Sequence, residues 1–197
     1  KPFGHELAGV VDAVGPEVHN VAPGDQVALQ SSGFCGDCDD CRNGRIDLCR
    51  GEHRNFWGEP AMGFSTYMQA PVNHAVPFDG LSADVASLAE PAGVGFDMVK
   101  TAAIEMGQTV CVVGPGPIAL VGVALAVHRG AARVVCVGHT HSHARLALAE
   151  KLGAEVVAWD GALDDCAALQ AAFDHVLMTA PVDCIAPPRP NADAIRI

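Results

Sequence analysis

Residues 110–119 read VCVVGPGPIA, and this stretch decides the fold expected for the second half of the chain. An apolar run long enough for a buried strand leads into a glycine-rich turn and then into Pro117, a residue favoured in the first turn of a helix. The spacing of Gly114, Gly116 and Ala119 matches the pattern G-x-G-x-x-A, in which a strand passes through a tight turn into a helix. We therefore expect a strand–turn–helix unit typical of doubly wound α/β folds.

The residues that follow continue this alternation. Nearly continuous apolar strands separated by helical segments are typical of βαβ units and of a parallel sheet. The tail, residues 180–197, contains four of the 13 prolines and gives no assignment. The predicted strands are 109–113, 133–137, 155–158 and 175–178, and the predicted helices are 117–129, 143–152 and 163–173.

The same turn is typical of dinucleotide-binding sites. Gly114 makes the tight turn, and Gly116 allows the backbone to approach a pyrophosphate. The helix N-terminus, which includes Pro117 and Ile118, offers unpaired N–H groups and the positive end of the helix dipole to the phosphates. We predict a dinucleotide site here rather than a turn that serves close packing alone.

The end of the second strand bears on the choice between NAD and NADP. An acid is expected there to hold the ribose hydroxyls of NAD, but the strand ends at Gly138 and no Asp or Glu occurs between Glu105 and Glu150. The following loop contains His139 and, further on, Arg145, which suit a 2′-phosphate, so we favour NADP slightly over NAD. The histidines of this loop, at 139, 141 and 143, could instead form a metal-binding tract or a solvated loop.

The first third of the chain has a different pattern. Short alternating segments predict strands at 9–15, 26–30 and 65–70. Residues 82–106 then read mostly as helix, capped by Ser82 and interrupted at Pro91 and Gly93. We expect a mostly-β unit ahead of the α/β unit.

Composition narrows the functional classes. The 197 residues contain 12 Lys plus Arg and 23 Asp plus Glu, and the net charge of −11 argues against a general nucleic-acid binder. No apolar run reaches the roughly 18 to 20 residues that span a bilayer, so we expect no membrane partner. The chain begins KPFGH without an initiator Met, and we expect it to be part of a longer protein.

Four of the eight cysteines are crowded together with the spacing C-x2-C-x2-C-x7-C. Four thiolates at short spacings can close a tetrahedral shell around zinc. Iron–sulfur ligation and disulfides are the alternatives. Cys111 and Cys136 lie inside apolar runs and are expected to be small core residues, and a reducing, cytoplasmic setting is favoured. The four predicted ligands of a structural zinc are Cys35, Cys38, Cys41 and Cys49.

Two further features involve carboxylates. Gly4 is followed by His5 and Glu6, a pair that is weak evidence for a site when taken alone. Glu90 lies inside the apolar stretch LAEPAGVG, and because an unpaired buried carboxylate costs several kcal/mol, it should be exposed, paired or on a metal.

In combination, the Gly-His-Glu motif, the cysteine cluster and the GPGPI turn at 114–118 resemble the zinc-containing medium-chain alcohol dehydrogenase family, most closely its polyol branch of sorbitol, threonine and butanediol dehydrogenases. The resemblance implies a partial GroES-like catalytic domain at 1–95 followed by a partial Rossmann domain, a doubly wound parallel sheet, at 96–197. It also implies homodimers or homotetramers of the full-length protein.

The resemblance further implies a catalytic zinc. His5 matches a zinc ligand of the family, Glu6 a ligand or close neighbour, and Glu90 either a third ligand or the group that holds the water on the metal. The family's first ligand, a Cys ahead of the Gly-His-Glu motif, has no counterpart in this sequence. The implied activity is hydride transfer between an alcohol or polyol and NAD(P)⁺. The alternative is a non-catalytic, zinc-stabilised fragment that at most binds a dinucleotide.

Overall fold

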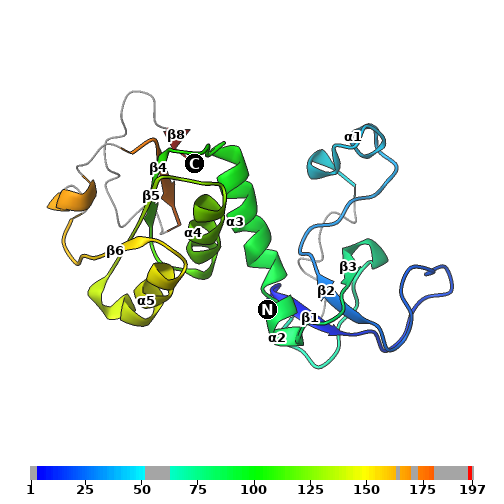
Figure 1. The fold of residues 1–197 in the computed structure, drawn as a ribbon. Helices are drawn as coiled ribbons and strands as arrows, with labels where there is room; N and C mark the ends of the chain where they lie inside the picture. Colours follow the sequence, from blue (N-terminus) through cyan, green and yellow to red (C-terminus); the bar gives the residue numbers. More distant parts are fainter. Residues whose placement is uncertain (1–3, 52–62, 163–164, 170–172, 180–194, 197) are drawn as a thin grey trace. The chain divides into compact units, whose positions relative to one another are not determined.

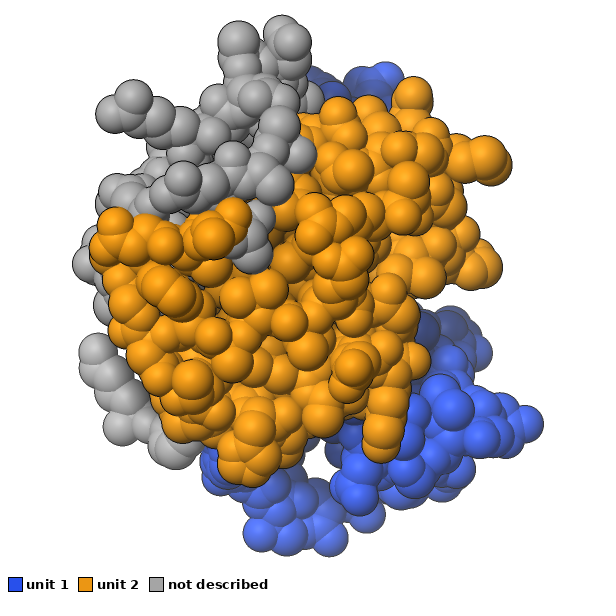
Figure 2. Space-filling view, turned by 60° about the vertical axis from the view of Figure 1, so that its left-hand side comes forward, with its two compact units in different colours: residues 1–90 blue, residues 91–197 orange. Residues whose placement is uncertain are grey.

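The computed structural model describes residues 4–51, 63–162, 165–169, 173–179 and 195–196. The chain divides into two compact units, unit 1 (Lys1–Glu90) and unit 2 (Pro91–Ile197), drawn in Figure 1 and coloured separately in Figure 2. The domain bounds 1–95 and 96–197 stay a prediction. Within the described ranges, no helix is both long and apolar enough to cross a membrane.

Unit 1 contains a three-stranded antiparallel sheet in the order β1-β2-β3. Its strands are β1 (Leu7–Val10), β2 (Gln26–Leu29) and β3 (Ala75–Pro77), and Leu7 lies opposite Leu29 in the β1–β2 pair. The strand predicted at 26–30 is confirmed as β2, and the one predicted at 9–15 begins earlier and ends at Val10.

The strand predicted at 65–70 is wrong. Met68 and Ala70 do pack against the core of unit 1, which explains the alternating pattern, but the backbone there is irregular. Residues 75–77 pair with β2 instead.

Helical elements complete unit 1. They are α1 (Asp39–Arg42), η1 (Ile46–Leu48), η2 (Val72–His74) and α2 (Ala83–Ala86), and α3 (Ala89–Thr101) runs from the end of unit 1 into unit 2. Ser82 caps α2 as predicted, because its hydroxyl accepts the Val85 N–H at 3.3 Å.

The break predicted at Pro91 and Gly93 is wrong in position. It falls at residues 87–88, and Pro91 lies in the first turn of α3, where the N–H that proline lacks would have no partner in the helix.

Unit 2 is built on a parallel sheet in the order β6-β5-β4-β7-β8. The four predicted strands are confirmed, and the helices predicted at 117–129 and 143–152 are present as α4 and α5. The element bounds are β4 (Thr109–Val113), α4 (Pro117–His128), β5 (Arg133–Gly138), η3 (Thr140–Ser142), α5 (His143–Lys151), β6 (Glu155–Ala158), η5 (Ala167–Leu169), β7 (His175–Met178) and β8 (Ile195–Arg196).

The helix predicted at 163–173 is wrong for the residues that the structure describes. The described residues there form 3-10 turns at 165 and in the short η5, not an α-helix, while residues 163–164 and 170–172 lie outside the described ranges. The apolar spacing that suggested a helix serves burial, since Cys166, Leu169 and Phe173 pack against the sheet.

Both faces of this sheet are covered. Val110, Val112 and Cys136 pack in one cluster with buried residues of α4 and α5, and Cys111 and Val113 pack on the other side with η5. The alternation along β4 therefore sorts its side chains to two cores, as a doubly wound sheet requires. Cys111 and Cys136 are fully buried, which confirms them as core residues.

Candidate functional site

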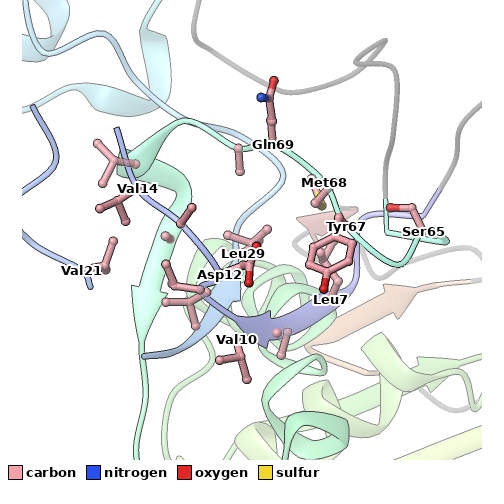
Figure 3. Close-up of a pocket in the computed structure, with 18 of the residues that line it drawn as sticks. Leu7, Val10, Asp12, Val14, Val21, Leu29, Ser65, Tyr67, Met68 and Gln69 are labelled. Atoms are coloured by element: carbon pink, nitrogen blue, oxygen red, sulfur yellow. The ribbon is translucent and has the colours of Figure 1, made fainter. Parts of the chain in front are cut away.

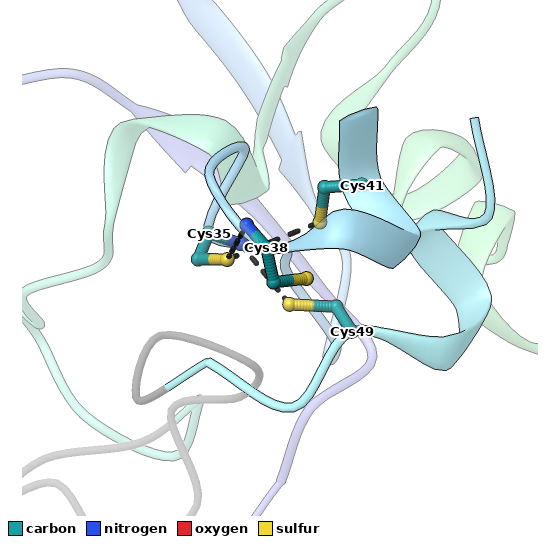
Figure 4. A group of neighbouring side chains, drawn as sticks. All are labelled: Cys35, Cys38, Cys41 and Cys49. Carbon is teal, nitrogen blue, oxygen red and sulfur yellow. Dashed lines mark hydrogen bonds between the residues drawn. The ribbon is translucent and has the colours of Figure 1, made fainter. Parts of the chain in front are cut away.

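The four cysteines of the predicted metal site meet in unit 1. Cys35 precedes α1, Cys41 lies within it, and Cys49 follows η1, so the turns between these short helices bring the thiols together (Figure 4). One sulfur from each lies within 4.8 Å of the other three, and the Sγ atoms of Cys35 and Cys41 are 3.9 Å apart.

Backbone N–H groups point at these sulfurs. The Cys35 N–H donates to Sγ of Cys49 at 3.2 Å, the Cys38 N–H to Sγ of Cys35 at 3.4 Å, and the Gly51 N–H to Sγ of Cys49 at 3.3 Å. Such donors are the outer contacts that support thiolate ligands of a metal. The donor set therefore fits a closed zinc site with four thiolate ligands.

The pKa shifts of two of these thiols agree with a metal site. Hydrogen bonds from the Cys38 and Asp37 backbone N–H groups lower the pKa of the Cys35 thiol to about 6. Loss of solvent raises the pKa of Cys41 to about 12, and the neighbouring thiols add to the rise. Without a cation the four sulfurs cannot all ionise at neutral pH, whereas a divalent ion removes this conflict.

Two residues outside the ligand set shape the cysteine segment. The Asn73 side-chain amide donates to the Phe34 carbonyl, next to Cys35. Gly51 has no room for a side chain, since an added Cβ would lie 2.5 Å from Cβ of Cys35. The sequence analysis did not single out either residue, because neither is a ligand type in a ligand pattern.

His5, Glu6 and Glu90 come together from the two ends of unit 1. One ligand atom from each lies within 4.8 Å of the other two, and Nε2 of His5 is 3.6 Å from Oε1 of Glu90. His5 and Glu6 precede β1, and Glu90 lies in the first turn of α3. An imidazole and two carboxylates are donors that zinc accepts. The donor set fits zinc with positions left open.

Glu90 is paired rather than exposed. Its side chain is 15% exposed, and Oε1 accepts the Ser31 hydroxyl at 2.8 Å. Ser31 lies just past the end of β2 and was missed by the sequence analysis, since a lone serine gives no metal-ligand signal. It holds the carboxylate oxygen that lies nearest to His5.

A hollow of about 470 Å³ with mixed polar and apolar lining lies elsewhere in unit 1 (Figure 3). Its lining includes Leu7, Val10, Leu29 and Met68. His5, Glu6 and Glu90 are not among the described lining residues. Because the core residues Val21, Val27 and Leu29 also line it, we interpret it as the incompletely filled core of unit 1.

The glycine-rich turn of unit 2 has the predicted geometry. Gly114 has φ of 92°, a conformation that favours glycine, and its N–H donates to the Val137 carbonyl at 2.8 Å. Gly116 is the N-cap of α4, and an added Cβ would meet no atom within 4 Å. Pro117 begins the helix. Open space in front of Gly116 is what a phosphate approaching the helix N-terminus needs.

Gly138 ends β5 beside this turn. An added Cβ there would lie 2.6 Å from Cδ of Pro115 and 3.2 Å from Cδ2 of Leu146. Close packing of the turn therefore explains why no acid stands at this position. Arg145 lies exposed on α5.

A carboxylate nevertheless reaches this edge of the sheet, from the next strand. Asp160 follows β6, accepts the Thr140 N–H at 3.0 Å and the Thr140 hydroxyl, and lies 3.3 Å from Nδ1 of His139. The Thr140 hydroxyl and N–H, and then His139, lower the pKa of Asp160. The sequence analysis missed this residue because it searched only near β5, although carboxyl ends of neighbouring parallel strands share one edge.

Comparisons with known proteins agree with this architecture. Residues 2–80 match the family model "Alcohol dehydrogenase GroES-like domain". The chain is 37% identical over 156 residues to L-idonate 5-dehydrogenase of Vitis vinifera, covering 78% of this chain and 42% of that protein. It is 35% identical over 157 residues to L-threonine 3-dehydrogenase of Bacillus velezensis, covering 78% and 44%.

A solved structure shows the same fold. The protein from Sinorhizobium meliloti 1021, described as a zinc-binding dehydrogenase bound to NADP, superposes with a TM-score of 0.75 at 29% identity, covering 91% of this chain and 54% of that one. The chain thus spans about half the length of the relatives it matches. Given the matching turn, cysteine cluster and GroES-like segment, the chain belongs to the zinc-containing medium-chain alcohol dehydrogenase family.

Proposed function

We propose that this chain is part of a zinc-dependent oxidoreductase that transfers a hydride between an alcohol or polyol and NAD(P)⁺. The observation that carries the proposal is the convergence of His5, Glu6 and Glu90 within 4.8 Å, from opposite ends of unit 1. The relatives support it, since they are named as dehydrogenases of L-idonate and L-threonine.

His5 and Glu90, with Glu6 as a third ligand or exchangeable neighbour, would hold the catalytic zinc. When bound, the ion supplies Lewis acidity that lowers the pKa of an alcohol. Ser31 keeps Oε1 of Glu90 turned toward His5 through its 2.8 Å hydrogen bond. The four cysteines would hold a second, structural zinc with no open position.

The turn of unit 2 would bind the nicotinamide dinucleotide, which accepts the hydride. The N-terminus of α4, from Gly116 through Ile118, would hold the pyrophosphate. Gly138 leaves no carboxylate for the ribose at the end of β5, and His139 and Arg145 suit a 2′-phosphate. Asp160 adds a negative charge nearby, which weakens the preference for NADP that these two residues suggest.

The substrate is proposed to be a polyol or small secondary alcohol, on the basis of Glu90 and the branch of the relatives. Assembly of the full-length protein into homodimers or homotetramers and a cytoplasmic location stay predictions.

A binding assay separates the dinucleotide site from the fold. NADPH and NADH fluorescence titrations should show binding to the chain, and Gly116→Ala should weaken it at least tenfold without lowering thermal stability, because the added Cβ meets open space in the free protein. Gly93→Ala, in α3, is the control that should leave binding unchanged. Equal binding by Gly116→Ala and the unaltered chain would contradict the proposal.

Zinc content and activity test the catalytic site. Purified metal-replete chain should hold about two tightly bound zinc ions, and Glu90→Gln or Ser31→Ala should lose one of them selectively, by an affinity loss of about 10–100-fold for Ser31→Ala. Turnover with polyols should fall in these variants while NADPH binding persists. One zinc per chain in the unaltered protein, insensitive to both substitutions, favours the alternative of a non-catalytic, zinc-stabilised fragment.

A further inference from the structure

A third group of ligand-type side chains meets at the carboxyl edge of the sheet in unit 2. His139 follows β5, His141 lies in η3, and Asp160 follows β6. One ligand atom from each lies within 4.8 Å of the other two, and all three residues are exposed. The proposed function does not use this arrangement as a metal site.

The spacing of one pair already suits a metal ion. Nδ1 of His139 and Oδ1 of Asp160 are 3.3 Å apart. Two ligands that lie 2.0–2.2 Å from a tetrahedral ion are themselves about 3.3–3.6 Å apart. An ion could therefore take the place of the proton between these atoms with little movement of either side chain.

The second histidine stands next to this pair. The rings of His139 and His141 are stacked, with centroids 5.2 Å apart and planes inclined by 14°. Because His141 is exposed in a short 3-10 turn, a tilt of its ring can bring a nitrogen to the same ion. His141 thus supplies a third ligand beside His139 and Asp160.

Asp160 is fixed by contacts outside the ligand set. Its two oxygens accept the N–H and the hydroxyl of Thr140. A carboxylate has about four acceptor positions, so two remain for an ion. Hydrogen bonds of this kind orient ligand carboxylates in metal sites.

We propose that His139, His141 and Asp160 form a surface site for one divalent transition-metal ion of the Zn²⁺ or Ni²⁺ class. Zn²⁺ and Ni²⁺ accept imidazole and carboxylate ligands together, whereas Mg²⁺ and Ca²⁺ prefer oxygen ligands alone. Three protein ligands leave coordination positions open to water or to an anion. The proposal is independent of the proposed dehydrogenase activity.

Calorimetric titration with Ni²⁺, in the absence of dinucleotide, tests it on the zinc-loaded chain after dialysis until only tightly bound zinc remains, so that the exposed surface site starts empty. We expect one Ni²⁺ to bind per chain with no zinc released into the dialysate. His141→Ala and Asp160→Asn should each weaken this step at least tenfold, and Thr140→Val, which removes only the outer hydroxyl, by about 10–100-fold. His128→Ala, an exposed histidine at the end of α4, is the matched control and should bind as the unaltered chain does.

Three results would overturn the proposal. They are no Ni²⁺ bound beyond the zinc already present, an ion that binds equally well to His141→Ala and Asp160→Asn, and Ni²⁺ uptake matched by zinc release. Titration with Mg²⁺ should give no binding step. A Mg²⁺ step that is present in the unaltered chain and absent from Asp160→Asn would refute the assigned ion class. The altered residues are exposed, and unchanged thermal unfolding of Asp160→Asn verifies that a lost step reports the site.

Discussion

Replacing Gly138 by Ala tests whether close packing between the turn and β5 excludes an acid from this position. The added Cβ would lie 2.6 Å from Cδ and 2.7 Å from Cγ of Pro115. Carbon atoms pack best at about 3.5–4.0 Å, so the turn must move by about 1 Å. Overpacking of this kind costs about 1–3 kcal/mol.

A smaller effect opposes this cost. Gly138 is not among the glycines with positive φ, so Ala adopts its backbone conformation and stabilises by about 0.4–1 kcal/mol through the unfolded chain. We expect a net destabilisation of about 1–2 kcal/mol. Gly138→Asp should suffer the same clash and therefore should not gain NAD binding.

A double-mutant cycle with Pro115→Ala isolates the contact, because that substitution removes both clashing ring atoms. Amide hydrogen exchange of β4 and β5 measures the stability of unit 2 separately from unit 1. Gly138→Ala should lower protection in the otherwise unaltered chain and much less in a chain that already carries Pro115→Ala. Gly93→Ala, whose Cβ meets open space inside α3, should stabilise by about 0.5–1 kcal/mol. Additive effects in the cycle would refute the reasoning.

Three further predictions concern the metal sites and a hydrogen-bonded aspartate of unit 2. Gly51→Ala should lower the zinc content of the cysteine site, since the Cβ would lie 2.5 Å from that of Cys35; elemental analysis measures this, with Gly9→Ala as a control in open space. Chelation should remove amide protection from unit 1 and leave it in unit 2, which hydrogen exchange resolves. The Thr109 N–H and hydroxyl lower the pKa of Asp174, so its contribution to stability is present above the unfolded pKa of about 3.9 and is lost as pH falls through the folded pKa. Asp174→Asn should therefore be less stable than the unaltered chain at pH 7, and urea unfolding should show the difference shrinking below about pH 4.

The sequence predicted unit 2 better than unit 1 for a physical reason. Strands buried on both faces, such as β4, are marked by continuous apolar runs, and the glycine turn fixes where α4 begins. The short strands of unit 1 carry weaker patterns, and the same alternation arises wherever an irregular segment packs one face on a core. Residues 65–70 are such a segment.

The candidate ligands of both zinc sites could be predicted from the sequence, but the residues that hydrogen-bond to those ligands could not. Spacing along the chain identifies four cysteines, whereas the Ser31 contact with Glu90 joins residues 59 apart in sequence. Asp160 was not predicted for a related reason, because it follows the next strand, β6, and contacts His139 across the edge of the sheet. Contacts that depend on which strands are neighbours appear only once the topology is known.

The two units differ in how much buried apolar core stabilises each of them, and this difference affects how the metal sites are tested. The sheet of unit 2 has buried apolar clusters on both faces. The core cluster of unit 1 has three buried residues, Val21, Val27 and Leu29, beside a hollow of about 470 Å³. A metal on His5 and Glu90 would tie the beginning of unit 1 to its end, so binding free energy there is also folding free energy. Loss of activity on chelation of both ions would therefore not by itself show Lewis-acid chemistry. That conclusion needs selective removal of the ion on His5 and Glu90, with the cysteine zinc in place and the amide protection of unit 1 unchanged.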